Sequence, residues 1–342
     1  ASNPTPTPRP TATPSPTPTA TPSPAPTATP RPTATPPPTA TPQPVPAPLS
    51  NPLLTYPGPS QMYTAAWSPN GTWIASAGAG STVQIWSAST AQLFYPYESG
   101  ASAVYSVAWS PDSRYVASAQ FDGTVQVWDI TSQSRIFYKH GHTGQVNAVA
   151  WSPDGKYIVS GGGDRTAKVW DVTTGELLLT YRGHSHYINA VAWSHGGEYI
   201  VSGSGDATAQ VWNATTGSLI NTYRGHVSDI LALSWAFDDA RIVSASKDTS
   251  AQVWNASTGT RYVYYAKHSN YVNAVAWAPD GQYIASGSVD TTVQIWGAAS
   301  GTKFLGYRAH SEQVQSVAWS PDSAKVASAS NDGTVKIWQA PS

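Results

Sequence analysis

The chain has 342 residues, of which only 11% are charged, and its formal net charge is −1. A nucleic-acid binder needs a strongly basic face, which this composition lacks, and no apolar run reaches membrane-spanning length, so we expect neither kind of partner. Cysteine is absent, which excludes disulfides, thiolate metal sites and cysteine nucleophiles. Because the chain begins with Ala1 rather than methionine, either a leader has been removed or the sequence starts at an arbitrary boundary.

Residues 1–50 differ in kind from the rest of the chain. They hold 19 of the 29 prolines and 13 threonines, with only two charged residues, Arg9 and Arg31. Such a segment cannot bury a core, and proline favours extended polyproline II structure, which spans about 3.1 Å per residue. Dense threonine with proline is also typical of O-glycosylated stalks. Three interpretations stay open: a passive spacer, a glycosylated extracellular stalk, or a segment ordered by packing on neighbours. The candidate O-glycosylation sites are Thr11, Thr13, Thr19, Thr21, Thr27, Thr29, Thr33, Thr35, Thr39 and Thr41.

From residue 53 onward the sequence is typical of short β-strands. The stretch 146–181 predicts four of them, at residues 146–151, 157–161, 166–170 and 177–181. Ser-Pro-Asp-Gly at 152–155 and Asp-Val-Thr-Thr-Gly at 171–175 have the composition of turns. Strands separated by turns at this spacing predict an all-β fold without helices.

Two tryptophan series recur seven times, each with a step of 42 residues. A period near 40 with strand-like sequence predicts the blades of a propeller or a solenoid, so residues 51–342 form one domain. The first series is Trp67, Trp109, Trp151, Trp193, Trp235, Trp277 and Trp319; the second is Trp86, Trp128, Trp170, Trp212, Trp254, Trp296 and Trp338.

The last repeat lacks a fourth strand, because only four residues follow Trp338. The missing strand has a counterpart near the other end: Leu-Leu-Thr-Tyr at residues 53–56 copies the same four residues at 178–181. We therefore predict a single seven-bladed β-propeller of four-stranded antiparallel blades, in which Leu53 to Tyr56 complete the last blade. Closing the ring in this way removes two exposed sheet edges.

With these features the repeat resembles the WD-repeat β-propeller family, over residues 53–342 or about 85% of the chain. The repeats are numbered along the chain as blades 1 to 7, so that blade 4 contains Trp193 and Trp212. That family has a Gly-His pair, a Ser or Thr, a turn Asp and a Trp-Asp pair, and blade 4 has at these positions Gly183-His184, Ser202, Asp206 and Trp212-Asn213. The resemblance implies a structural tetrad in each blade, in which His joins a buried carboxylate to a hydroxyl that also accepts from the indole.

Five blades keep all four tetrad residues. Blade 2 keeps Ser118, Asp122 and Trp128 but has Gly100 in place of His, and blade 1 keeps only Ser76 and Trp86. We expect these two blades to be less stable than the others. The complete sets are His142, Ser160, Asp164, Trp170; His184, Ser202, Asp206, Trp212; His226, Ser244, Asp248, Trp254; His268, Ser286, Asp290, Trp296; and His310, Ser328, Asp332, Trp338.

No motif predicts an enzyme or a cofactor. The tetrad that the resemblance implies accounts for the regular His and Asp residues. The glycine-rich runs at 161–163 and 203–205 lead into strands, so they lack the helix N-terminus that binds phosphate. His140 and His186 lie in loops of neighbouring blades, where a shared metal is a minor alternative.

A partner surface is expected where the loop before each first strand meets the turn between the second and third strands, since antiparallel strands place both at one end. The resemblance makes this end the usual interaction face. Aromatic residues concentrate there in the two blades with incomplete tetrads, either as binding residues or as fillers of the space left by the missing His. The candidate partner-binding residues are Tyr63, Tyr105, Phe121, Tyr187, Leu231, Lys247 and Tyr271.

The sequence favours a non-catalytic interaction and assembly module that is exported and extracellular or at the cell surface. In that hypothesis the Pro/Thr segment, with or without glycans, joins copies of the chain into a homopolymer. The alternative is a recognition domain displayed on the segment, which binds a protein partner on the top face. A cytoplasmic location is the alternative to export.

Overall fold

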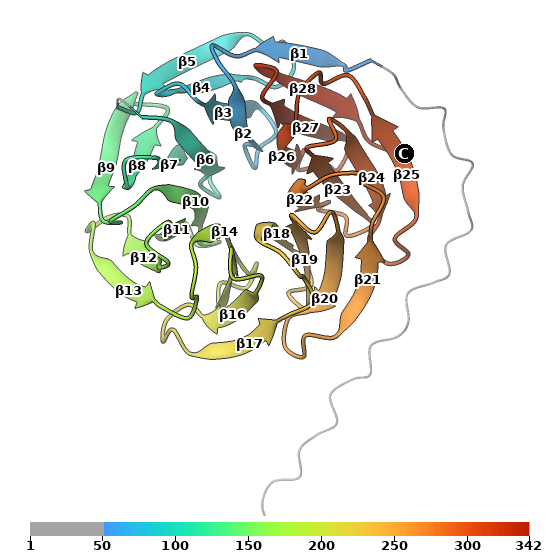
Figure 1. Cartoon of the computed structure of the whole chain (residues 1–342). Coiled ribbons are helices and arrows are strands. Elements are labelled where there is room, and N and C mark those ends of the chain that lie inside the picture. Colours follow the sequence, from blue (N-terminus) through green and yellow to red (C-terminus); the bar gives the residue numbers. More distant parts are fainter. Residues whose placement is uncertain (1–50, 101, 342) are drawn as a thin grey trace, which may run out of the picture. The chain divides into compact units, whose positions relative to one another are not determined.

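The structure is a computed structural model that describes residues 51–100 and 102–341. The chain forms seven four-stranded antiparallel sheets, and no helix occurs among these residues. Figure 1 shows the sheets as blades of a ring, each with its innermost strand nearest the central axis and its outermost strand at the rim. The prediction of a seven-bladed β-propeller is confirmed.

The strands fall into four positions per blade, counted outward from the central axis. The innermost strands are β2 (Met62–Trp67), β6 (Val104–Trp109), β10 (Val146–Trp151), β14 (Ile188–Trp193), β18 (Ile230–Trp235), β22 (Val272–Trp277) and β26 (Val314–Trp319). The second strands are β3 (Trp73–Gly78), β7 (Tyr115–Gln120), β11 (Tyr157–Gly162), β15 (Tyr199–Ser204), β19 (Arg241–Ser246), β23 (Tyr283–Ser288) and β27 (Lys325–Ser330). The third strands are β4 (Thr82–Ser87), β8 (Thr124–Asp129), β12 (Ala167–Asp171), β16 (Ala209–Asn213), β20 (Ala251–Asn255), β24 (Val293–Gly297) and β28 (Thr334–Gln339). The rim strands are β5 (Leu93–Glu98), β9 (Ser134–His140), β13 (Leu177–Tyr181), β17 (Leu219–Tyr223), β21 (Arg261–Tyr265), β25 (Lys303–Tyr307) and β1 (Leu54–Pro57).

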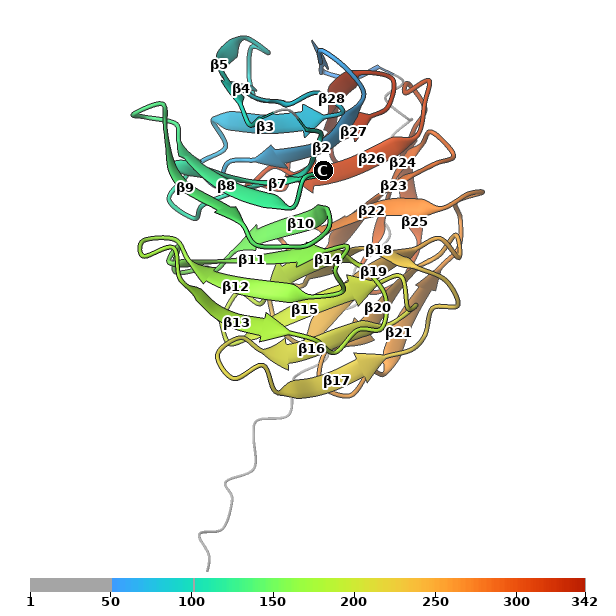
Figure 2. The same cartoon turned by 60° about the vertical axis from the view of Figure 1, so that its left-hand side comes forward.

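The middle strands form the core. After its first residue, every second strand is buried along its whole length, because the neighbouring blades cover both faces of the sheet. Figure 2 shows the blade faces packed against one another around the ring. The rim strands instead leave apolar side chains such as Leu219 and Tyr264 about half exposed.

The predicted turns form as their composition requires. Ser152 donates to Asp154 Oδ1 at 2.6 Å and accepts from the Tyr157 amide at 2.9 Å, while Gly155 takes φ of +71°. At the turn between the third and fourth strands of the same blade, the Asp171 carboxylate accepts hydrogen bonds from the amides of two following residues at 2.8 Å. Asn213 accepts in the same way, at 3.1 and 2.9 Å, so the loss of the Trp-Asp dipeptide leaves this turn intact.

The ring is closed by β1, one residue further along than the predicted 53–56. This strand pairs antiparallel with β28 in the order β1-β28-β27-β26, and Tyr56 lies opposite Val335. The ladder continues at both ends, since the Leu53 amide donates to Ile337 at 2.8 Å and the Gly58 amide to Gly333 at 2.7 Å. The N-terminal strand therefore completes the last blade, as predicted.

One aromatic contact recurs at every blade junction. A rim-strand ring of one blade lies against the second-series tryptophan of the next, as Tyr223 lies on Trp254 with centroids 4.5 Å apart and planes 2° from parallel. The closing strand supplies the same contact, because Tyr56 stacks on Trp86 at 4.4 Å and 7°. The other pairs are Tyr97–Trp128, Phe137–Trp170, Tyr181–Trp212, Tyr265–Trp296 and Tyr307–Trp338.

Three of these tyrosines also bond across the junction. The hydroxyl of Tyr181 donates to Gln210 at 2.5 Å, that of Tyr223 to Gln252 at 2.6 Å, and that of Tyr265 to Gln294 at 2.6 Å. These pairs were not predicted from the sequence, although Gln and Tyr each recur at the 42-residue step. A buried hydroxyl that is bonded in this way ties one blade to the next.

Candidate functional site

The structure brings all four residues together in each of the five complete tetrads. In blade 5, His226 Nδ1 lies 2.7 Å from Asp248, His226 Nε2 lies 2.8 Å from Ser244 Oγ, and Trp254 donates to the same oxygen at 3.1 Å. A neutral His that donates through Nδ1 satisfies every group in this chain of bonds. The other four sets have the same contacts at 2.7–3.2 Å.

The Ser-His-Asp order of a tetrad matches that of a hydrolytic triad, but its environment differs. Ser244 is 0% exposed, and its oxygen already accepts from the Trp254 indole and contacts His226. A nucleophile must reach its substrate, and this hydroxyl lies inside the blade. The bonds therefore stabilise the blade rather than forming a reactive site.

Blade 7 illustrates the electrostatics of a tetrad. Burial by itself would raise the pKa of Asp332, but hydrogen bonds from Thr334 and His310 outweigh it and lower the pKa to about 2. Burial lowers the pKa of His310 and outweighs the opposite effect of Asp332. At neutral pH the pair is therefore a carboxylate beside a neutral imidazole.

Blades 1 and 2 replace the tetrad in different ways. In blade 1 Trp86 still donates to Ser76 at 3.2 Å, and the Met62 side chain lies against Gly58, at the position of the missing His. In blade 2 Trp128 donates to Gln126 at 3.1 Å instead of to Ser118.

The Ser118 hydroxyl is buried and makes no hydrogen bond to the Trp128 indole; the polar group beside it is the Tyr97 hydroxyl. The side-chain oxygen of Gln120 lies 3.8 Å from the point where a Cβ on Gly100 would sit. The buried residues Met62 and Gln120, rather than surface aromatics, therefore lie at the positions of the two absent imidazoles.

The top end of the propeller, where each innermost strand begins, carries a ring of bulge residues. In every innermost strand the ladder skips one residue near its start, as between Val146 and Ala148. A bulge turns its side chain away from the alternation of the strand. The seven skipped residues are Tyr63, Tyr105, Asn147, Asn189, Leu231, Asn273 and Gln315.

All seven bulge residues line one open hollow of about 450 Å³, which we call the top mouth. Its lining contains no charged residue. Asn147 donates to the Ile188 carbonyl of the next blade at 2.8 Å, Asn189 does the same to Ile230 at 2.9 Å, and Asn273 to Val314 at 3.0 Å. Because each Nδ2 is held by a carbonyl, each amide oxygen faces away from that bond.

An aromatic cluster borders the top mouth on the side of blades 1 and 2. The rings of Tyr63 and Tyr105 stack with centroids 5.8 Å apart, and Phe121 meets Tyr105 edge-on at 6.1 Å. Phe121 is 56% exposed. Burial raises the pKa of Tyr105, with a further contribution from Tyr63, so its hydroxyl stays protonated.

Three other candidate residues of this face, Tyr187, Lys247 and Tyr271, lie outside the lining of the top mouth. Tyr187 donates to Asp229 at 2.5 Å across the junction of blades 4 and 5, and Lys247 contacts the same carboxylate at 2.8 Å. Burial would raise the pKa of Asp229, but the bonds from Lys247 and Tyr187 lower it, so the carboxylate stays charged. The structure thus places Leu231 with the two tyrosines of the mouth, whereas Tyr271 is exposed outside its lining.

The described residues contain no group of three His, Asp or Glu side chains placed to hold a metal ion. His140 contacts Thr124 at 3.4 Å, and His186 packs edge-on against Tyr187 at 4.0 Å. In the part of the chain that the structure covers, no helix is long and apolar enough to cross a membrane. The predicted glycosylation sites lie outside the described residues.

Comparison with known families gives one result. The family model described as "WD domain, G-beta repeat" matches seven successive segments, at residues 50–87, 93–129, 132–171, 175–213, 217–255, 260–297 and 301–339. Propellers of this family generally serve as non-catalytic scaffolds and commonly bind protein partners. Comparison with curated proteins gives no match.

Proposed function

The chain belongs to the WD40 repeat family, and from that premise we propose that it is a non-catalytic protein-interaction and assembly module. One observation carries the proposal. The tetrad Ser and Trp recur every 42 residues in all seven blades, whereas the seven bulge residues of the top mouth comprise three Asn, two Tyr, one Leu and one Gln. A ring of changing, accessible side chains on a repeated scaffold is the pattern expected of a binding surface.

Within this class we propose an exported, extracellular subunit that assembles with copies of itself through residues 1–50. The support is compositional: this segment is dominated by proline and threonine, and the whole chain is only 11% charged. Low net charge weakens repulsion between copies and suits a packed assembly. Threonines between prolines, from Thr11 to Thr41, are the proposed glycan carriers.

A second function is favoured by the aromatic cluster at the top mouth. Tyr63, Tyr105 and Phe121 lie in contact beside neutral amides, and aromatic side chains are common anchors of protein interfaces. In this alternative the propeller is a recognition domain for a protein partner, and residues 1–50 only display it.

Electron microscopy and sedimentation velocity of two versions of the protein distinguish these functions. The first version is the full chain, and the second begins at Ser50 and keeps every strand from β1 to β28. Assembly predicts filaments or rings from the full chain and single discs from the shorter one. Single discs from both versions at micromolar concentration would contradict assembly and favour the recognition domain.

A further inference from the structure

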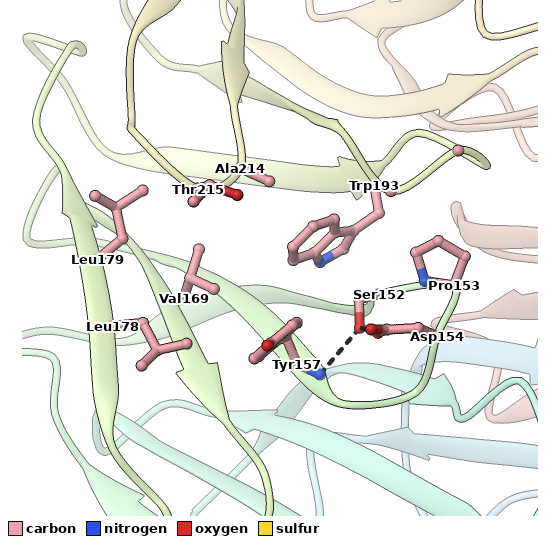
Figure 3. Close-up of a pocket in the computed structure, with 12 residues that line it drawn as sticks. Ser152, Pro153, Asp154, Tyr157, Val169, Leu178, Leu179, Trp193, Ala214 and Thr215 are labelled. Atoms are coloured by element: carbon pink, nitrogen blue, oxygen red, sulfur yellow. Dashed lines mark hydrogen bonds between the residues drawn. The ribbon is translucent and has the colours of Figure 1, made fainter.

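A second hollow lies between blades 3 and 4, at the bottom end of the propeller where the innermost strands finish. Its volume is about 430 Å³. Figure 3 shows Tyr157, Val169, Leu178 and Leu179 of blade 3 on one side of it and the Trp193 indole of blade 4 on the other. We call this hollow the blade 3–4 groove.

Trp193 differs from most of its counterparts in the other blades. Trp109, Trp151, Trp235 and Trp319 each donate their indole N–H to a carbonyl of the preceding blade at 3.0–3.2 Å. The Trp193 N–H is buried without a hydrogen-bond partner in the described part of the chain, a state shared with Trp67. Trp193 is the one of these two that lines the groove. A buried unpaired donor is unfavourable, so an occupant that brings an acceptor gains affinity when the indole edge turns toward the groove.

The local sequence explains why this junction is open. Trp193 is followed by Ser-His-Gly-Gly, where other blades have Ser-Pro-Asp or a similar turn. The amides of His195 and Gly196 donate to Asp239 at 2.7 and 2.6 Å, which ties this turn to blade 5, on the side away from blade 3. Gly197 takes φ of +76°, and a Cβ there would lie 3.2 Å from Pro153. The turn therefore leaves the groove uncovered.

The groove has the chemistry that receives proline-rich peptides. Extended polyproline II segments dock on aromatic surfaces, where proline rings pack on side-chain rings and peptide carbonyls accept hydrogen bonds. Trp193 and Tyr157 supply the rings, and Leu178 is 50% exposed beside them. Asp154 adds a carboxylate at the edge, with a side chain 46% exposed; its cationic neighbour Lys156 is 69% exposed and lies 3.7 Å away, so an arginine can displace this long, solvent-exposed contact. The site thus suits an apolar, extended peptide that carries a positive charge.

The chain itself contains such a peptide twice. Thr-Pro-Arg-Pro-Thr-Ala-Thr-Pro occurs at residues 7–14 and again, unchanged, at 29–36. The two copies include Arg9 and Arg31, the only charged residues before residue 51. Charge complementarity therefore selects this repeated unit over the other proline-rich stretches as the occupant beside Asp154.

The described chain begins on the same side of the propeller as the groove. As a rim strand, β1 starts at the bottom end, where Leu54 lies opposite Ile337 near the end of β28. The nineteen residues from 32 to 50 would span about 60 Å as polyproline II, at about 3.1 Å per residue. That length is enough to reach from the bottom of one propeller to the bottom of a neighbour.

We propose that the blade 3–4 groove binds the repeated Pro-Arg-Pro-Thr unit, residues 8–11 or 30–33, of a second copy of the chain. The inference rests on the proposed assembly function and assigns it a site. The unit packs its prolines on Trp193 and Tyr157, a peptide carbonyl accepts from the Trp193 indole, and the arginine pairs with Asp154.

Fluorescence polarisation with a labelled peptide of residues 27–37 tests the site. The protein that begins at Ser50 is suitable, because its ring is closed entirely by the described strands. Trp193→Phe keeps a ring but removes the donor, and we expect about five-fold weaker binding. Trp67→Phe is the matched control, because its indole N–H is also buried without a described partner and it lies in blade 1, away from the groove; it should leave binding unchanged. Leu178→Asp, at a half-exposed position, should abolish binding without unfolding the protein.

Arginine recognition has its own test. Substituting alanine for Arg31 in the peptide, or Asp154→Asn in the protein, should each weaken binding several-fold and reduce its salt dependence. The two changes together should cost no more than either alone, because they remove the same pair. Equal binding of a peptide without arginine would overturn the assignment of this unit.

Self-assembly of the full chain, measured beside peptide binding, distinguishes a wrong site from a wrong function. Assembly that persists in the Leu178→Asp full chain would overturn the groove as the contact while leaving the assembly function standing. Peptide binding to the groove while the full chain stays monomeric would overturn the second copy as occupant and, with it, the proposed assembly. Loss of both peptide binding and assembly in Leu178→Asp, with wild-type melting, is the result that we expect.

Discussion

The contact that closes the ring can be tested at one residue, Tyr56. This side chain is 5% exposed and comes from the closing strand, and it stacks on Trp86 of the first blade at 4.4 Å. Replacing a buried aromatic residue with alanine typically costs about 3–5 kcal/mol, and a stacked pair contributes about 0.5–1.5 kcal/mol beyond its buried area. We expect Tyr56→Ala to lower the free energy of unfolding by about 3–4 kcal/mol.

The matched substitution is Tyr223→Ala, at a junction where the chain runs on without interruption. Its ring stacks on Trp254 in the same way, and its hydroxyl also donates to Gln252 at 2.6 Å. Tyr223→Ala should therefore cost about 1 kcal/mol more than Tyr56→Ala. The phenylalanine variants isolate that bond: Tyr223→Phe should cost about 1 kcal/mol, and Tyr56→Phe should be nearly neutral.

Equilibrium unfolding in urea measures these differences, and size-exclusion chromatography reports aggregation from an opened ring. If closure fails, β28 becomes an exposed edge that pairs with other chains, so Tyr56→Ala should aggregate earlier than Tyr223→Ala on heating. A loss below about 1 kcal/mol for Tyr56→Ala, with the full loss for Tyr223→Ala, would refute the view that this stack holds the ring closed.

Three further predictions concern the tetrads and the top mouth. Ser244→Ala leaves the His226 and Trp254 nitrogens unpaired and should cost about 2–3 kcal/mol in urea unfolding, whereas Ser118→Ala, at a hydroxyl that bonds neither an imidazole nor an indole, should cost less than about 1 kcal/mol. The lowered pKa of Asp332 adds about 1–2 kcal/mol of stability after solvent screening, which is present above about pH 4 and is lost as the pH falls toward 2. The pKa of His310 is also lowered, so protonation of this residue weakens the fold as the pH falls below about 6.5. The melting temperature should therefore decline in acid and stay unchanged in mild base. Tyr105→Ala should change the unfolding free energy by less than about 1 kcal/mol, and a loss above 3 kcal/mol would show that the aromatic cluster is a packing element.

The 42-residue repeat determined much of the fold from the sequence alone. Seven copies of the same strand pattern bury their faces only against one another, so a ring follows, and the copy of Leu-Leu-Thr-Tyr at 53–56 identified the closing strand to within one residue. The tetrad partners were predictable for the same reason, because equal spacing in every repeat places equivalent residues at equivalent points.

The departures from the repeat were decided by the tertiary structure. The sequence kept Ser118 and Trp128 in blade 2, yet with no imidazole to orient the hydroxyl, the indole bonds Gln126 instead. Likewise, only the folded ring places Tyr187 and Lys247 on one carboxylate across a junction. Repeated residues share one environment, so their bonds can be inferred from a single copy. A residue in a blade that breaks the pattern bonds whichever group the packing brings within reach, as Trp128 bonds Gln126, and no spacing along the chain specifies that group.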